Sequence, residues 1–228
     1  MDVKLVSYSQ PTAEFASMGI DDAQELIAYC ARVSNPANQL NTETSEKLIR
    51  YLIKHQHWSP LEMVSACCEI TTTRDIARQI LRHRSFSFQE FSQRYADPTK
   101  DLNFVLREAR LQDLKNRQNS VELAMQTPEE RKLAMDWEKA QTRVKLAAIE
   151  AYNFAINNGI AKEQARAVLP EGMIESRLYM NGTLRSWIHF IELRSANGTQ
   201  KEHQQVAIAC AKAIAEIFPM TTSLVTNG

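Results

Sequence analysis

The sequence has no long hydrophobic run and no net charge, and these two absences narrow the classes of protein that it can encode. No apolar stretch approaches the roughly 18 residues of a membrane-spanning helix, so we expect no membrane segment. The first ten residues contain an early acid and lack the apolar region of a signal peptide. Because 27 basic residues balance 27 acidic ones, the whole chain lacks the field that attracts long nucleic acids. We therefore expect a cytoplasmic protein that binds neither a membrane nor a nucleic acid polymer.

Cysteine and histidine are too few and too scattered to predict a metal site. Cys67 and Cys68 are adjacent and the other two cysteines stand alone, so the CxxC spacing of metal and redox sites is absent. His55 and His57 would share a face only in a strand, and the five histidines show no zinc-ligand spacing. We expect small buried thiols and no metal.

The length and composition are those of one ordinary globular domain. The chain has 228 residues, of which 44% are hydrophobic and 24% charged, and this is enough to bury a core without outside help. No internal repeat, low-complexity tract or interdomain linker is visible. We therefore treat residues 1–228 as a single domain.

Helical and extended patterns alternate along this domain. Period-two patterns and β-branched residues predict extended segments at 2–8, 61–72, 85–94, 102–107 and 173–180. Capping signals and period-3.6 patterns predict helices at 21–32, 42–55, 73–82, 127–157, 163–169, 183–194 and 200–217. The polar stretch 108–130 is predicted to be a helical insertion with an irregular middle. These patterns predict a helix-rich α+β domain.

The segment from Arg74 to Arg94 concentrates positive charge in a chain that has none overall. The predicted helix 73–82 would carry Arg74, Arg78 and Arg82 on one face, and the whole segment holds five arginines and one histidine against two acids. Taken alone, such a row is usually a solvated helix face with acidic partners. The alternating Ser and Phe that follow favour an anion-binding surface instead. We expect a ligand with phosphate, because arginine offers bidentate and permanently charged donors.

The order and spacing of motifs around this segment resemble those of the flavin-dependent thymidylate synthases. The signature is Arg82-His83-Arg84, seven further residues and then Ser92. The flanking pieces are His57-x-Ser-Pro-x-Glu62, Arg78-Gln79, a Ser-x-Arg-Tyr run ending at Tyr95, Arg166 with Leu169-Pro170, and Leu193-Arg194 followed by Gln200 and Glu202. One difference is Gln89, which stands where many relatives have Asn and would alter one hydrogen bond.

The resemblance implies a reductive methylation of dUMP to dTMP. Methylenetetrahydrofolate would be the carbon donor, NADPH the reductant, and FAD the mediator between them. The implied fold is a helix-rich α+β domain with a mixed or antiparallel sheet, which assembles as a homotetramer whose active sites are built from several subunits. Since no cysteine is a convincing nucleophile, Arg194 would stabilise negative charge on the N3/O4 edge of uracil.

The resemblance also implies which residues bind each ligand. The expected dUMP contacts are Gln79, Arg82, Glu90, Phe91, Ser92, Gln93, Arg94 and Arg166. The expected FAD contacts are Ser59, Arg82, His83, Arg84 and Glu90, with Thr183, Leu184, Arg185 and His189 supplied by a neighbouring subunit. Ser34 and His57 would line the flavin and folate region.

Two other classes of protein remain open at this point. A nucleic-acid-binding module could use the basic segment 74–94 with Phe86, Phe88 and Phe91 as stacking platforms. Neutral overall charge and the lack of a second basic patch disfavour it, and for Phe86 and Phe88 core packing is the expected role. A non-catalytic nucleotide sensor would keep the residues that bind dUMP and lack the chemistry, but the presence of Ser92 and Arg194 favours the enzyme.

Overall fold

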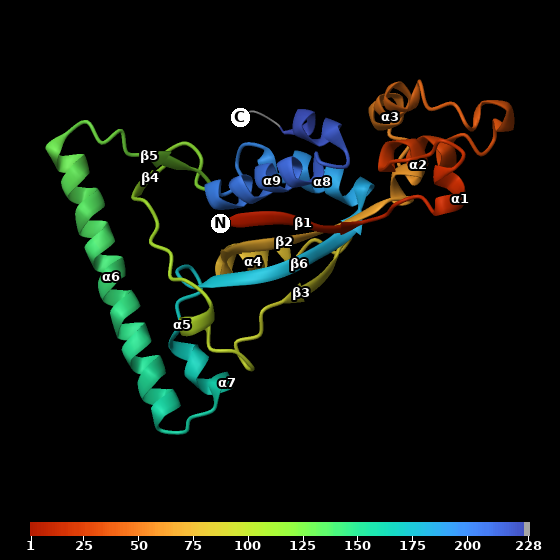
Figure 1. The fold of residues 1–228 in the computed structure, drawn as a ribbon. Coiled ribbons are helices and arrows are strands. Elements are labelled where there is room, and N and C mark those ends of the chain that lie inside the picture. Colours follow the sequence, from red (N-terminus) through yellow and green to blue (C-terminus); the bar gives the residue numbers. More distant parts are fainter. Residues whose placement is uncertain (226–228) are drawn as a thin grey trace.

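The computed structural model describes residues 1–225 and is built around a four-stranded antiparallel sheet (Figure 1). The strands, in their order across the sheet, are β1 (Asp2–Tyr8), β2 (Ser65–Thr73), β6 (Glu175–Thr183) and β3 (Ser87–Glu90). A separate two-stranded hairpin consists of β4 (Arg110–Gln112) and β5 (Ser120–Glu122). The expected α+β class is confirmed, and the main sheet is antiparallel throughout.

One face of the main sheet supports the hydrophobic core. Alternate residues of β2 are buried, as period-two strands with one covered face require. The core combines them with α4 (Arg74–Ile80), α8 (Leu184–Ser195) and α9 (Lys201–Ile214). Trp187 and Phe190 of α8 lie in this cluster and are almost fully buried. On the opposite face of the sheet, exposed Tyr179 donates a hydrogen bond to Glu69 over 2.7 Å.

The N-terminal helices gather at one end of the sheet (Figure 1). They are α1 (Ala13–Ala16), α2 (Ala23–Ala31) and α3 (Ser45–Lys54). Asp22 caps α2 by accepting a hydrogen bond from the backbone N–H of Glu25 at 2.8 Å, which is the expected start of this helix. Ile27 and Ile49 are fully buried and join these helices to the core.

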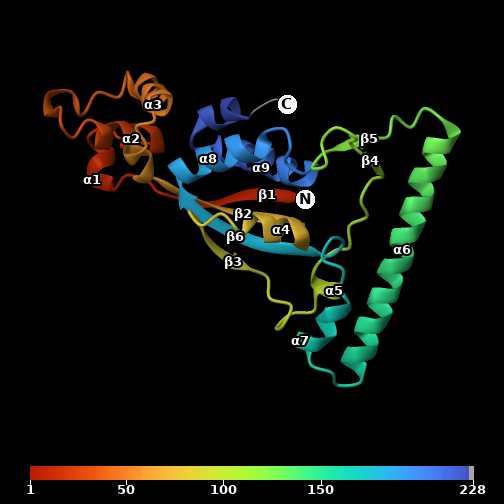
Figure 2. The ribbon, with the colours of Figure 1, turned by 180° about the vertical axis from the view of Figure 1, so that it is seen from behind.

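A long helix, α6 (Pro128–Asn157), stands on the opposite side of the molecule from α1–α3 in both views (Figures 1 and 2). Its start is a capping box, in which Thr127 and Glu130 each accept a hydrogen bond from the other's backbone N–H at 3.1 Å. Near its middle, buried Gln141 accepts from the N–H of Arg107 at 2.8 Å and donates to its carbonyl at 2.9 Å. Helix α7 (Lys162–Ala165) closes the far end against Tyr152.

Two of the predicted elements are wrong. Residues 102–107 form no strand but a single bridge from Phe104 to Ile174. In the stretch 108–130, the residues that precede α6 contain the β4–β5 hairpin and no helix. Asp113 closes its turn by accepting hydrogen bonds from the backbone N–H groups that follow, and Lys201 of α9 pairs with acids on both sides of the hairpin. Contacts with α9, which is distant in the sequence, therefore stabilise the hairpin in this region.

Three further boundaries differ from the expectation. Helix α4 ends at Ile80, so Arg82 lies in the turn beyond it. Residues 59–62 form a 3-10 turn, and strand β2 begins only at Ser65. Of the extended segment 85–94, only β3 pairs with the sheet. The remaining elements are α5 (Pro98–Asp101) and 3-10 turns at Pro36–Asn38, Arg166–Val168 and Pro219–Leu224.

Neither a membrane span nor a metal cluster is found in residues 1–225. No helix there is both long and apolar enough to cross a bilayer. No group of three or more His, Cys, Asp or Glu side chains is placed to hold a metal ion.

Candidate active site

The turn after α4 is held against α8 by its own aromatic side chain. Phe86 is buried and meets Trp187 edge-to-face, with ring centroids 4.8 Å apart. It packs over Gly182, where an added Cβ would lie 2.5 Å from Phe86 Cδ1, so only glycine fits beneath the ring. The hydroxyl of Ser186 donates to the carbonyl of Ser85 over 3.2 Å. The core role expected for Phe86 is confirmed.

This packing brings His83 and Arg194 together, although they are 111 positions apart in the chain. The Nε of Arg194 donates to Nε2 of His83 over 3.0 Å. Because a guanidinium can only donate, His83 accepts at Nε2 and carries its proton on Nδ1. Burial and the charge of Arg194 lower the pKa of His83 to about 4, which keeps the imidazole neutral at pH 7. A neutral histidine therefore orients the arginine expected to be catalytic.

Free positive charge collects around this pair. Burial, and then the nearby charge of Arg82, lower the pKa of Arg194 below its ordinary value. Arg82 and Arg84 are exposed, and neither takes part in a salt bridge within residues 1–225. These guanidiniums are therefore available to an external anion.

The arginines of α4 behave differently, and the predicted cationic stripe is wrong. Arg74 is buried and lies 3.4 Å from Glu90 and 3.6 Å from Glu171. Arg78 reaches the same two acids at 3.5 and 3.6 Å. Glu90 also accepts a hydrogen bond from the hydroxyl of Ser176 at 2.7 Å. The positive charge of Arg74 and Arg78 is thus neutralised by acids of the same chain. The carboxylate of Glu90, which was expected to contact ligands, is one of these acids.

The expected dUMP segment continues along the sheet edge beyond Glu90. Phe91 is half-buried, and its N–H donates to the carbonyl of Arg177 over 2.8 Å. The hydroxyl of Ser92 accepts from the N–H of Arg94 at 3.3 Å. Gln93 is buried, and its Nε2 has no hydrogen-bond partner within residues 1–225. Gln89 is exposed on β3 opposite Tyr179 of β6.

Two of the arginines expected to contact dUMP lie beside the same residue, Glu163. Arg94 lies 3.4 Å from the carboxylate of Glu163, and the Nε of Arg166 donates to the Glu163 carbonyl at 3.4 Å. The side chains of Arg94 and Glu163 are both about half exposed, at 58% and 50%. Such an exposed pair can open for a better anion at little cost.

The start of α8 carries the second expected FAD segment. The hydroxyl of Thr183 caps α8 by accepting from the N–H of Ser186 at 3.4 Å. Leu184 is fully buried in the core, and its N–H donates to the carbonyl of Val64. Arg185 forms a salt bridge with Glu62.

An aromatic pair lies beside this segment. Exposed His189 packs against Trp58 with the two rings tilted by 59° and their centroids 4.4 Å apart, and exposed Ser59 follows Trp58 in the chain. The turn after α4 carries Arg82, His83 and Arg84 and is called the signature turn below. In the same chain, Ser186 of α8 donates a hydrogen bond to this turn at Ser85. The two expected FAD segments are therefore neighbours within one subunit.

The expected flavin and folate residues Ser34 and His57 share Tyr51 as a neighbour. Ser34 and Tyr51 line one cavity of about 560 Å³ between α2 and α3. The ring of Tyr51 lies 4.2 Å from His55 and 6.0 Å from His57. Of these three exposed rings, Tyr51 lines the cavity, and the two histidines lie beside Tyr51.

A buried histidine, His203, lies beside Gln79 and was not predicted from the sequence to belong to the site. Gln79 Nε2 donates to Oε1 of Gln200 over 2.9 Å, and Oε1 of Gln79 lies 3.2 Å from Nδ1 of His203. His203 is fully buried. Its place in the apolar row of α9, with Val206 and Cys210, is the signal that could have identified it.

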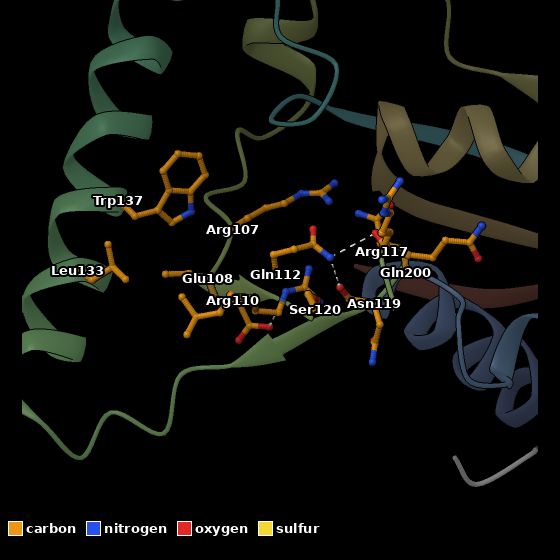
Figure 3. A pocket seen from close by; sticks show the side chains of 13 residues that line it. Arg107, Glu108, Arg110, Gln112, Arg117, Asn119, Ser120, Leu133, Trp137 and Gln200 are labelled. Carbon is orange, nitrogen blue, oxygen red and sulfur yellow. Dashed lines mark hydrogen bonds and ion pairs between the residues drawn. The ribbon is translucent and has the colours of Figure 1, made fainter. Parts of the chain in front are cut away.

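A larger cavity that was not predicted lies between the hairpin and α6. It measures about 620 Å³ and is lined by Arg107, Arg110, Leu133, Trp137 and Gln200, among others. Figure 3 shows Trp137 of α6 on one side and Arg107 and Arg110 on the other. Gln200 borders this cavity and also contacts Gln79, so it connects the two regions.

Comparison with known proteins identifies the class of enzyme. The family model described as "Thymidylate synthase complementing protein" matches residues 16–220. A probable flavin-dependent thymidylate synthase of Paramecium bursaria Chlorella virus 1 is 47% identical over 219 residues, which cover 96% of each chain. The flavin-dependent thymidylate synthase of Synechocystis sp. is 45% identical over 222 residues, again with 96% coverage of each.

A solved structure agrees with these sequence matches. It is a UMP/dUMP methylase from Streptomyces cacaoi bound with 5-Br dUMP, with a TM-score of 0.74 and 26% identity. The likeness covers 97% of this chain and 93% of that chain. The protein is therefore an enzyme of the methyltransferase class. It belongs to the family of flavin-dependent thymidylate synthases, as its motifs predicted.

Proposed function

We propose that this enzyme methylates dUMP to dTMP, with FAD bound at the signature turn and dUMP along the edge of the sheet. The names of its relatives and the 5-Br dUMP bound to the structural neighbour support this reading. The observation that carries it is the pair of exposed guanidiniums at Arg82 and Arg84, which have no acidic partners within residues 1–225, with Arg82 close enough to Arg194 to lower its pKa.

The side chains present fit a bound FAD. Its diphosphate needs permanently charged donors, which Arg82 and Arg84 supply, and the neutral ring of His83 adds an N–H at Nδ1. Ser59 and Thr183 add hydroxyls at the start of their helical turns. When bound, the flavin would supply the redox chemistry of the methylation, while the protein orients and polarises the substrate.

The dUMP phosphate, a dianion, would replace the Glu163 carboxylate as the partner of Arg94 and would also attract Arg166, which within residues 1–225 bonds only the backbone carbonyl of Glu163. Gln79, Phe91, Ser92 and the neighbouring backbone would hold the rest of the nucleotide.

Arg194 would act on the uracil ring. Its guanidinium is fixed by His83 and would stabilise negative charge that develops on the N3/O4 edge. A covalent cysteine route is disfavoured, because nucleophilic attack needs a thiolate. Burial raises the pKa of Cys68 to about 12 and also raises the pKa of Cys30, Cys67 and Cys210.

The remaining co-substrates are part of the same proposal. Methylenetetrahydrofolate would donate the carbon and NADPH the reducing equivalents, as the family resemblance implies. The cavity of Ser34 and Tyr51 offers the ring of Tyr51 as a stacking surface for a flat heterocycle, and His57 lies beside that ring.

Assembly as a homotetramer completes the proposal. Helix α6 exposes a row of large apolar side chains, among them Leu133 (47%), Trp137 (45%), Val144 (50%) and Phe154 (65%). A single chain would leave this surface to water, and a second copy can cover it. Light scattering should give a mass near four chains of 26.0 kDa. A stable monomer with full activity would refute this assembly.

The decisive experiment is to purify the protein and measure its flavin. We expect a yellow protein that releases close to one FAD per chain on denaturation and that methylates dUMP. Arg82→Gln and Arg84→Gln should lose FAD, whereas Arg50→Gln, an exposed arginine paired with Glu46 on α3, should keep it. A colourless preparation that takes up no added FAD would refute the flavoenzyme and favour the nucleic-acid-binding alternative.

A further inference from the structure

Four polar side chains form a continuous hydrogen-bonded row from the hairpin side to the centre of the core. Gln200 Nε2 donates to Glu202 Oε2 at 3.0 Å, and Gln79 Nε2 donates to Gln200 Oε1 at 2.9 Å. Gln79 Oε1 then meets Nδ1 of His203 at 3.2 Å. The row joins α4 to α9, and neither His203 nor Gln200 has a role in the function proposed above.

The charged end of the row determines its direction. Glu202 forms salt bridges with Arg107 and Arg110, and its carboxylate can only accept hydrogen bonds. Gln200 must therefore turn its amide N–H₂ toward Glu202 and its carbonyl toward Gln79. The same logic turns the N–H₂ of Gln79 toward Gln200 and its carbonyl toward His203. Each amide in the row can adopt only one of its two orientations.

The other end of the row fixes the tautomer of His203. Because the carbonyl of Gln79 accepts, His203 carries its proton on Nδ1. Nε2 of His203 is then an acceptor, and within residues 1–225 it is buried without a partner. Burial and the charge of Arg194 lower the pKa of His203 to about 3, so the ring stays neutral. Its ring lies 5.8 Å from Phe190 and 6.3 Å from His83.

We infer that Gln200 and His203 are positioning residues that fix the orientation of the Gln79 amide for the nucleotide. The row uses one N–H of Gln79, so the second N–H remains for an acceptor oxygen of dUMP. Without the row the amide can rotate by half a turn and present its carbonyl to that oxygen, which repels it. The inference rests on the proposed function, because it takes dUMP as the ligand of Gln79.

The test compares variants of the FAD-loaded enzyme. His203→Leu removes the Nδ1 donor but keeps an apolar side chain in the core, whereas His203→Asn retains an N–H near the same place. Gln200→Met breaks the row at a partly exposed position, where folding is not at risk. Gln205→Met makes the same chemical change at an exposed position of α9 and is the matched control.

We expect His203→Leu and Gln200→Met to raise the Kd of dUMP by calorimetry, and its KM, roughly fivefold to tenfold, the effect of one hydrogen bond. The kcat should change less than about twofold. His203→Asn should recover most of the affinity, and Gln205→Met should match the wild type. Equal losses in His203→Leu and His203→Asn would indicate packing alone and overturn the inference, as would wild-type affinity in Gln200→Met.

A second measurement separates this inference from the proposed function. Nitrogen NMR of histidine-labelled protein, assigned by the signal lost in His203→Leu, should show His203 protonated on Nδ1. If His203 were protonated on Nε2 instead, the proposed direction of the hydrogen bonds in the row would be wrong, whatever the substrate is. A wild-type enzyme that binds no dUMP overturns the proposed function and the nucleotide role of Gln79, while the NMR result still decides the direction of the row.

Discussion

The arginines of α4 and those of the turn that follows it differ in the acids that reach them. Arg74 and Arg78 share Glu90 and Glu171, and Arg74 is buried. Arg82 and Arg84 are exposed, and no salt bridge in the described part of the chain involves them. Identical side chains a few positions apart thus hold the fold together in one region and stay available to a ligand in the next.

Arg74→Ala should give the largest effect, on stability. The substitution leaves Glu90 largely buried beside a weaker set of partners, and breaking a buried pair by removing one side costs about 3–5 kcal/mol. Urea unfolding monitored by circular dichroism measures the loss. Arg82→Ala is the matched control and should change stability by less than about 0.5 kcal/mol while it weakens FAD binding. Equal stability losses in both variants would remove the distinction between the two regions.

Arg194→Ala should give the largest effect on activity. It removes the group expected to stabilise charge on uracil, and such deletions reduce kcat by about 10²–10³-fold. Stability should fall much less than in Arg74→Ala, because Arg194 is bound to a neutral histidine and not to a buried acid. Turnover is measured as dUMP-dependent methylation, with Arg50→Ala as the surface control. Normal turnover by Arg194→Ala would show that the assigned role is wrong.

The two neutral histidines, His83 of the turn after α4 and His203 of α9, make the folded state sensitive to acid. The pKa of His83 is lowered to about 4 and that of His203 to about 3, by burial first and by Arg194 second. Below pH 6.5 the unfolded chain binds protons at these histidines and the folded chain does not, so acid favours unfolding. The contribution of the two histidines to the free energy of unfolding is therefore fully present above pH 6.5 and is lost as the pH falls toward 3.

The slope of this loss is at most about 1.4 kcal/mol per pH unit for each histidine. We expect the melting temperature of the wild type to fall as the pH drops from 7 to 5, and that of His203→Leu to fall less steeply. Parallel melting curves for the two proteins across this range would contradict a neutral buried His203.

Ser92→Ala should give the smallest effect. Ser92 lies beyond both arginine groups. Within residues 1–225 its hydroxyl accepts a hydrogen bond from the backbone of Arg94 and forms none with a histidine. A serine is a weak nucleophile without a base, so we expect weaker dUMP binding by about 0.5–1.5 kcal/mol and measurable turnover. A dead Ser92→Ala enzyme with normal dUMP affinity would assign chemistry to this hydroxyl.

Features that depend on neighbouring residues could be predicted from the sequence. Asp22 and Thr127 begin α2 and α6 because a cap needs only the next few backbone N–H groups. The strand in 65–73 is visible from its own composition, because Cys, Ile and Thr suit a buried strand, and one face of β2 is buried along its whole length. The family signature is also local, and it located the turn that carries Arg82, His83 and Arg84.

Features that depend on distant residues could not be predicted. Glu171 neutralises Arg74 and Arg78 from almost a hundred positions away, so the count of charges in 74–94 overstated the free charge on α4. The hairpin at 110–122 is attached by Lys201, which no local pattern indicates. His203 reads as one more residue of an amphipathic helix until α4 is placed beside it.

The hydrogen bonds of Gln141 give α6 a mechanical role. A helix of 30 residues is about 45 Å long, and Gln141 binds both polar groups of the Arg107 backbone near its middle, as a paired strand would. The side chain of Arg107 in turn contacts Asp75 of α4 and Glu202 of α9. Arg107 therefore couples the middle of α6 to α4 and α9, the helices that hold Gln79 and His203. A displacement of α6 would be transmitted to these two helices through the contacts of Arg107.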